Sequence, residues 1–120
     1  MIYTSYYAKL KKLPNTIIPI GISIGKPKGI NILWYPKLQP THKILYKYKL
    51  DKNEAEYEKE YVKCILSTLH PNTVKNELME LSNGNDVCLM CYEKGFCHRR
   101  IVTKWLQEHG IPCEEYQWSD

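Results

Sequence analysis

The feature that most constrains this chain is a strand–loop–helix pattern near its carboxyl end. Residues 86–91 form an apolar run that is too short and too sharply bounded for a helix. A short loop follows, and the Cys-His-Arg triplet at 97–99 then opens a segment, 98–109, with apolar residues at helical spacing. The pattern predicts reactive side chains at the carboxyl end of a strand. In open α/β sheets, that end is where ligands bind.

Three further runs complete the predicted sheet. Residues 16–24 are mostly isoleucine, which is typical of a parallel strand buried on both faces. Residues 1–5 and 112–118 predict the first and last strands. We therefore expect one α/β domain over residues 1–120, a compact three-layer arrangement in which a mostly parallel sheet of about four strands has helices on both faces.

The helices between these strands have recognisable caps. Thr41 is expected to cap a short helix, and Asp51 followed by Glu54 resembles the capping box of a longer one. Apolar side chains recur at helical spacing over residues 57–69, and Asn72 can cap a further helix. These helices supply the layers that would cover the sheet.

The charge of the chain indicates its partners. The net charge is +4, and every Lys, Arg, Asp or Glu before Asp51 is a lysine. Such an asymmetry can mark an anionic partner, but the excess is modest and arginines are not clustered as in a nucleic-acid binder. The charge alone therefore favours a solvated basic face, and nucleic acid is not the expected partner. No apolar run approaches the roughly 20 residues that span a bilayer, so we expect no membrane partner. The sequence leaves a homodimer open.

Cysteine usage indicates the compartment. The chain has five cysteines, an odd number, and no secretory signal opens it. We therefore expect reduced thiols, no disulfide framework and a cytoplasmic location.

A metal site is the first chemical alternative for residues 88–98. Cys88 and Cys91 are formally a Cys-x2-Cys pair, and Cys97-His98 follows, as in structural zinc sites. However, side chains of a strand alternate between faces, so these first two cysteines point apart and cannot hold one ion. We expect packed thiols, with no metal ion and no cofactor.

A cysteine nucleophile is the second alternative. Cys91 and Cys97 lie near a helix start beside His98 and two arginines, an environment that favours the thiolate. The sequence does not match the Cys-x5-Arg phosphate-binding motif of tyrosine phosphatases. That motif requires an arginine six positions after the cysteine, whereas the residue six positions after Cys91 is Cys97 and Arg99 comes two residues later.

Anion binding is favoured over both. Backbone N–H groups at the helix start, Gly95, and Arg99 or Arg100 suit a phosphate or carboxylate. Alternatively, these arginines pair with carboxylates such as Glu108. Glu93 could act as a general base, bind a ribose hydroxyl or orient an arginine, and its spacing does not decide between these roles.

The segments described above resemble the domain-of-unknown-function 488 family. The similarity lies in Leu89-Met90-Cys91-Tyr92-Glu93-Lys94, Phe96-Cys97-His98-Arg99, Tyr3-Thr4-Ser5-Tyr6, Ile20-Gly21-Ile22-Ser23, Tyr35-Pro36-Lys37-Leu38-Gln39-Pro40 and the helix from residue 56 to 69. It covers essentially the whole chain, and implies an α/β domain of bacterial, archaeal or phage origin. The matching site positions that it implies are Cys91, Glu93, Cys97, His98 and Arg99, with Thr4, Ser5 and Tyr6 at the end of the first strand. The resemblance names no reaction.

These observations lead to a specific hypothesis for the site. The first strand end (Thr4, Ser5, Tyr6), the loop after the second strand (Ser23, Lys26) and the loop with Cys91, Glu93, Cys97, His98 and Arg99 converge on one pocket. We expect it to bind a small anionic, nucleotide-like ligand, with the phosphate on Arg99 and acid–base chemistry at Glu93 or His98. The alternative is a non-catalytic protein that sequesters a ligand or binds a partner through a tyrosine-rich surface.

Overall fold

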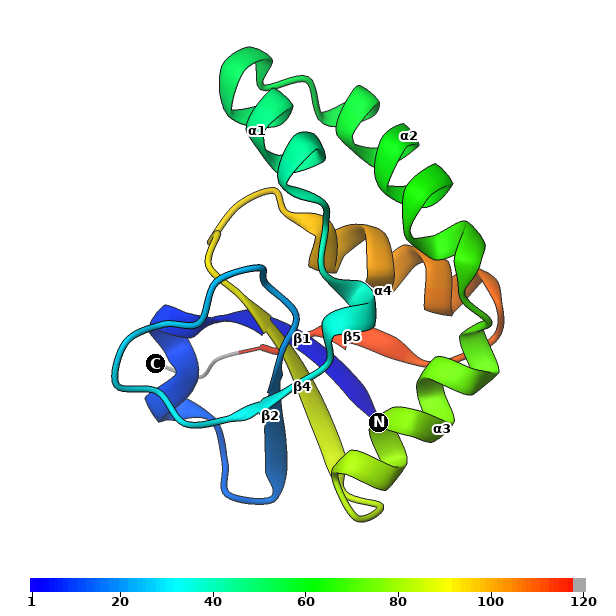
Figure 1. The fold of residues 1–120 in the computed structure, drawn as a ribbon. Helices are drawn as coiled ribbons and strands as arrows, with labels where there is room; N and C mark the ends of the chain where they lie inside the picture. The colour runs from blue at the N-terminus through cyan, green and yellow to red at the C-terminus, as the bar shows by residue number, and fades with distance from the viewer. Residues whose placement is uncertain (118–120) are drawn as a thin grey trace.

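A five-stranded parallel sheet forms the centre of the molecule, in the order β3-β2-β4-β1-β5 (Figure 1). This computed structural model describes residues 1–117. The strands are β1 (Ile2–Tyr6), β2 (Ile17–Gly21), β3 (Leu33–Trp34), β4 (Asp86–Cys91) and β5 (Cys113–Glu115). Every pairing is parallel, so the carboxyl ends of all the strands meet at one edge of the sheet.

The predicted α/β class is confirmed, with five strands instead of about four. The additional strand, β3, pairs only through Leu33 and Trp34. Two residues are too few for a periodic pattern to reveal. The last strand ends at Glu115, three residues before Trp118, which was expected to belong to it and lies outside the described residues.

Within residues 1–117, four α-helices and three 3-10 helices surround the sheet. They are α1 (His42–Asp51), α2 (Glu54–Cys64), α3 (Pro71–Leu81), α4 (His98–Glu108), η1 (Tyr7–Lys12), η2 (Pro36–Leu38) and η3 (Leu66–Thr68). Figure 1 shows α1 and α2 side by side at the top of the molecule. Among the residues described, no helix is both long enough and apolar enough to span a bilayer.

Each face of the sheet has its own core. On one face, sheet residues such as Ile20 and Leu89 pack with the inward sides of the α-helices, including Val102 and Leu106 of α4. The other face is covered by η1 and by a smaller cluster of side chains: Tyr7, Ile17, Cys88, Met90, Tyr3, Leu10, Leu13, Ile32, Trp34 and Tyr116. Helices therefore lie on both faces, but the second face is covered by a 3-10 helix.

The helix caps differ in part from the prediction. Thr41 caps α1 as expected, by accepting a hydrogen bond from the backbone of Ile44. The expected capping box at Asp51 is wrong, because Asp51 is the last residue of α1. Lys52 then turns the chain with a left-handed φ of 53°, and Asn53 caps α2.

The expected cap of α3 is also wrong. His70 occupies the cap position and Pro71 is the first helical residue, so Asn72 already lies inside the first turn. Proline is well suited to this position because its missing N–H would have no helical partner there.

Candidate functional site

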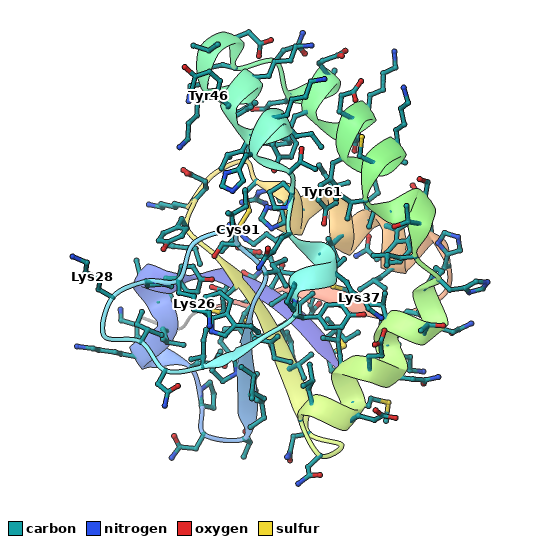
Figure 2. All side chains as sticks on the ribbon, viewed as in Figure 1. Lys26, Lys28, Lys37, Tyr46, Tyr61 and Cys91 are labelled. Atoms are coloured by element: carbon teal, nitrogen blue, oxygen red, sulfur yellow. A yellow bond between two sulfur atoms is a disulfide. The ribbon has the colours of Figure 1, made fainter. Side chains whose placement is uncertain are left out.

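A cavity of about 520 Å³ lies between the carboxyl ends of β2 and β4 and the α1–α2 pair. Figure 2 shows Cys91 at the end of β4, beneath α1. The lining side chains come from the loop after β2, from the β4–α4 loop, and from α1 and α2: Ser23, Ile24, Gly25, Pro40, His42, Leu45, Tyr48, Lys49, Lys52, Tyr57, Cys91, Tyr92, Glu93, Phe96, Cys97 and His98. The cavity is at the edge of the sheet where the sequence predicted a pocket.

The structure brings only part of the predicted site to this cavity. The predicted residues that line it are Ser23, Cys91, Glu93, Cys97 and His98. The predicted residues that do not line it are Thr4, Ser5, Tyr6, Lys26 and Arg99. We expected the ends of three strands to meet at one pocket. In the structure, only the ends of β2 and β4 contribute predicted residues to the cavity.

Three aromatic rings form one wall of the cavity. Tyr48 from α1, Tyr57 from α2 and Phe96 from the β4–α4 loop have ring centroids 5.3 Å apart in every pairing. Burial raises the pKa of Tyr57, so its hydroxyl keeps its proton at neutral pH. This wall can pack against a planar, apolar part of a ligand.

Charged side chains lie on the α1 side and in the β4–α4 loop. Lys49 of α1 and Lys52, which directly follows α1, line the cavity and are exposed, and Lys52 Nζ lies 5.1 Å from the centre of the Tyr48 ring. Glu93 is the carboxylate among the lining residues and is also exposed. The cavity therefore has more positive than negative charge around it.

Cys91 and Cys97 are joined by a disulfide bond. This differs from the expectation of reduced thiols, because a cysteine count does not reveal which cysteines the fold brings together. Cys88 packs in the core on the opposite face of the sheet, whereas Cys91 lines the cavity. The side chains of Cys88 and Cys91 therefore point to opposite faces of the sheet, as predicted. This prediction was the argument against a metal site formed by these two cysteines.

A different trio has metal-ligating spacing. Among the described residues, Cys91, Cys97 and His98 each offer a ligand atom, and these atoms lie within 4.8 Å of one another. Two thiolates and an imidazole are a donor set that zinc accepts. In this structure, however, the two sulfurs are bonded to each other, and the arginine that follows His98 contacts both.

Arg99 is fully buried beneath the cavity, and its guanidinium group is occupied. Nε donates to both carboxylate oxygens of Glu115, at 3.0 and 3.3 Å, and Nη2 donates to one of them at 3.0 Å. Nη2 also donates to the Lys94 carbonyl at 2.9 Å, and Nη1 donates to the Glu93 carbonyl. The expected role as a phosphate contact is therefore corrected. Arg99 holds the β4–α4 loop in place.

His98 is buried at the first position of α4. Its Nε2 lies 2.7 Å from the Ile22 carbonyl, which only accepts, so Nε2 carries the proton and donates. Burial lowers the pKa of His98 to about 4, assisted by the positive charge of Arg99 and opposed by the bond to Ile22. At neutral pH His98 is therefore uncharged, and its Nδ1 retains a lone pair.

The residues predicted from the second strand have separate surroundings. Ser23 is buried, its hydroxyl donates to the Gly25 carbonyl at 2.7 Å, and it therefore accepts from the Tyr7 hydroxyl, also at 2.7 Å. Lys26 instead lies over the Trp34 ring, 5.3 Å from its centre. Ser23 thus forms part of the cavity wall, whereas Lys26 packs against Trp34 of β3 outside the cavity lining.

The first-strand residues lie beneath the cavity or on the other face. Thr4 donates to Glu115 at 2.7 Å, and the Arg99 guanidinium sits 5.6 Å above the Tyr6 ring, so both support the Arg99–Glu115 pair. Ser5 is fully buried and its hydroxyl has no partner among the described residues. Alternation along β1 directs Ser5 to the face opposite Thr4.

Two parts of this region were not predicted from the sequence. The first is the α1 side of the cavity, including Tyr48, Lys49 and Lys52, although the lysine-rich first half of the chain was a signal for it. The second is Glu115, which ends β5 at the same edge of the sheet. The rule that carboxyl ends of parallel strands share an edge could have found it.

Comparison with known families identifies the chain. A family model described as the active DUF488-N3 subclade matches residues 2–110. The chain belongs to this DUF488 subclade. The family resemblance of the motifs is thereby confirmed, and the match extends over the segments that form the cavity. Comparison of this DUF488 protein with curated proteins and with solved structures gave no match.

Proposed function

We propose that the cavity binds a small anionic ligand of nucleotide type and that Glu93 performs acid–base chemistry on it. The volume of about 520 Å³ is within the range of small-molecule sites. Its place at the carboxyl ends of parallel strands agrees with the general location of ligands in open α/β sheets.

The observation that carries the proposal is the pairing of the aromatic wall with lysines in one cavity. The rings of Tyr48, Tyr57 and Phe96 would pack against a base, since every base has an apolar face. Lys49 and Lys52 would approach the phosphate, replacing the role first expected of Arg99.

Glu93 is the better placed of the two expected acid–base residues. Its carboxylate is exposed at the cavity, where it would bind a sugar hydroxyl or take a proton from the ligand. His98 has its pKa lowered to about 4 by burial, so it is a weak base, and it would act as a hydrogen-bond acceptor through Nδ1.

The tyrosine-rich interaction surface is less well supported. Of the tyrosines, only Tyr46 and Tyr92 are among the exposed large apolar side chains, and Tyr92 already lines the cavity. Most of the others are at least half-buried, several of them within the two cores. The tyrosine content thus reflects packing inside the fold more than an interface.

Isothermal titration calorimetry tests the binding proposal. Purine and pyrimidine nucleoside monophosphates and diphosphates are titrated, with the parent nucleosides and inorganic phosphate for comparison. We expect at least one nucleotide to bind more tightly than its nucleoside. The double change Lys49→Gln and Lys52→Gln should weaken that binding roughly tenfold, as expected for two exposed charge contacts.

Lys47→Gln is the matched control, because Lys47 lies on the same helix but pairs with Glu56 at 3.3 Å. Absence of binding by every nucleotide, or an equal effect of the control, would refute the proposal. For a nucleotide that is turned over, Glu93→Gln should retain binding and lose turnover. Turnover that persists in this variant excludes Glu93 as the acid–base residue.

A further inference from the structure

We propose that Cys91 and Cys97 form a redox-active dithiol that exchanges with small disulfides entering through the cavity. This activity goes beyond the binding proposed above and does not depend on the ligand being a nucleotide. The two sulfurs are bonded to each other, and both cysteines line the cavity. Their exposed fractions are only 1% and 5%, so a small molecule can reach them through the cavity more readily than a protein surface can.

The surroundings of the pair favour the thiolate over the thiol. Cys97 is the N-cap residue of α4, and its Sγ accepts the backbone N–H of Arg99 at 3.4 Å. Arg99 Nη1 lies 3.0 Å from the same sulfur and 3.2 Å from Cys91 Sγ. A helix N-terminus and a nearby cation both stabilise a thiolate, and Cys97 has both.

Glu115 gives Arg99 its orientation. Because the carboxylate takes Nε and Nη2, the remaining nitrogen, Nη1, is directed to the two sulfurs and the loop carbonyl of Glu93. The guanidinium group remains charged at any physiological pH. A fixed cation therefore remains beside the sulfurs when the disulfide opens.

The other cysteines are in different environments. Burial raises the pKa of Cys113 to about 11, and burial also raises the pKa of Cys88, so both remain neutral thiols. Cys64 is exposed on α2, 3.9 Å from the Glu60 carboxylate. Cys88 is therefore a matched control, since it lies in the same strand as Cys91 but on the opposite face.

The proposed exchange is balanced without a further reactant. In the reduced protein the Cys97 thiolate attacks one sulfur of a small disulfide RSSR, and RS⁻ leaves. The Cys91 thiolate then attacks Cys97 Sγ in the mixed disulfide, forming the Cys91–Cys97 bond and releasing the second RS⁻. Two electrons pass from the cysteines to RSSR, and the two thiol protons end on the two released thiolates.

The alternative is that the reduced pair and His98 bind a metal ion. The position of Arg99 argues against this, because a guanidinium 3.0 and 3.2 Å from the two sulfurs would repel a cation bound between them. The test distinguishes the two by measuring thiols and metal on the same reduced protein.

Thiol counting by mass spectrometry after maleimide labelling tests the proposal. The full chain is reduced, freed of reductant, and treated with glutathione disulfide or hydroxyethyl disulfide. With labelling carried out after denaturation, so that buried thiols also react, we expect five labelled cysteines before treatment and three after it, the unlabelled pair being Cys91 and Cys97. Cys91→Ser should trap a mixed disulfide on Cys97, and Cys97→Ser should react roughly tenfold more slowly at Cys91.

Cys88→Ser should exchange like the unchanged protein. The proposal is overturned if no intramolecular disulfide forms in the unchanged protein, which needs no variant to fold. It is also overturned if the sulfurs react no faster than Cys88. Finally, one equivalent of a transition metal in the freshly reduced protein, lost in Cys91→Ser and Cys97→Ser, would assign the pair to metal binding.

Discussion

At the scale of single residues, Arg99 connects the strand ends to the β4–α4 loop. Its guanidinium bonds to Glu115 of β5, to the carbonyls of Glu93 and Lys94, and to two sulfurs. Its Cζ lies 5.6 Å from the centre of the Tyr6 ring of β1. Burial of a charged guanidinium costs free energy, and the ion pair with a carboxylate offsets that cost. Loss of the carboxylate therefore destabilises the folded protein. The loop that forms one wall of the cavity therefore depends on Glu115.

Changing Glu115→Gln should lower the free energy of unfolding by about 2 kcal/mol, because charge-assisted hydrogen bonds from Arg99 are replaced by weaker neutral ones. The Glu115 side chain is 28% exposed, which limits the effect. Urea denaturation measures it, with the exposed neighbour change Glu114→Gln as control. Equal effects of the two changes would show that Arg99 does not rely on this carboxylate.

His98 predicts a specific pH dependence of stability. Its pKa is about 4 in the folded protein, where burial disfavours the charged form, and near 6.5 when unfolded. The unfolded state therefore binds more protons between these values. The contribution is fully present above pH 6.5 and is lost as the pH falls towards 4, to a total of about 3 kcal/mol.

Denaturation of the unchanged protein and of His98→Gln across pH 4–7 measures this contribution. Glutamine does not titrate, so the stability difference between the two proteins should shrink as the pH falls, while carboxylates titrate equally in both. Parallel curves over this range would contradict the burial-driven shift.

Gly21 of β2 leaves room for the Trp34 ring of β3. A Cβ built on it would lie 2.2 Å from Cζ3 of the Trp34 ring, which is rigid and already packed. Gly21→Ala should therefore lower the free energy of unfolding by about 1–3 kcal/mol through overpacking. Gly25→Ala is the control, since its nearest neighbour, the Tyr92 hydroxyl, is 3.6 Å away. A small effect at both sites would show that Trp34 moves aside easily.

Side-chain direction could be predicted where a strand fixes it, and not where a partner lies far along the chain. The alternation that separates Cys88 from Cys91 was readable from the sequence and holds in the structure. The role of Arg99 could not be predicted from the sequence, because its partner Glu115 is 16 residues away. Glu115 lies on β5, and the position of β5 beside β1 depends on the arrangement of the whole sheet.

At the scale of elements, α1 and α2 cover the cavity. They are joined by a short turn in which Lys52 adopts a left-handed φ of 53° and Asn53 caps α2. The rings of Tyr48 and Tyr57 project from these two helices to the aromatic wall. Stability of this pair of helices therefore bears directly on the shape of the cavity.

Asn53→Ala should lower the free energy of unfolding by about 1 kcal/mol, because its side-chain oxygen accepts the backbone N–H of Glu56 at 3.1 Å. Asn76→Ala, on the exposed side of α3, serves as control. Thermal unfolding followed by circular dichroism measures both, and an unchanged midpoint for Asn53→Ala would contradict the cap.

Most helices and strands could be predicted from the sequence, but their first and last residues were predicted less accurately. β4 was predicted over the residues where it occurs, because its apolar run is bounded on both sides. The predicted start of α2 was two residues early, because Asp51 and Asn53 are both good N-cap residues. The sequence does not show that Lys52 adopts a left-handed φ, which leaves Asn53 as the cap.

At the scale of the whole molecule, the parallel sheet places the cavity and the disulfide at one edge. The strand order β3-β2-β4-β1-β5 puts β4 at the centre, so its carboxyl end is flanked by those of β1 and β2. The sequence predicted a parallel sheet and a site at this edge. It could not predict the strand order, and hence could not predict that α1, rather than β1, would line the cavity.

A crystal structure of the protein soaked with the nucleotide that binds most tightly tests the central claim most directly. We predict electron density for the nucleotide in the cavity, with its base against the rings of Tyr48, Tyr57 and Phe96 and its phosphate within reach of Lys49 and Lys52. Nucleotide density outside this cavity, with the cavity itself empty, would contradict the assignment of the site.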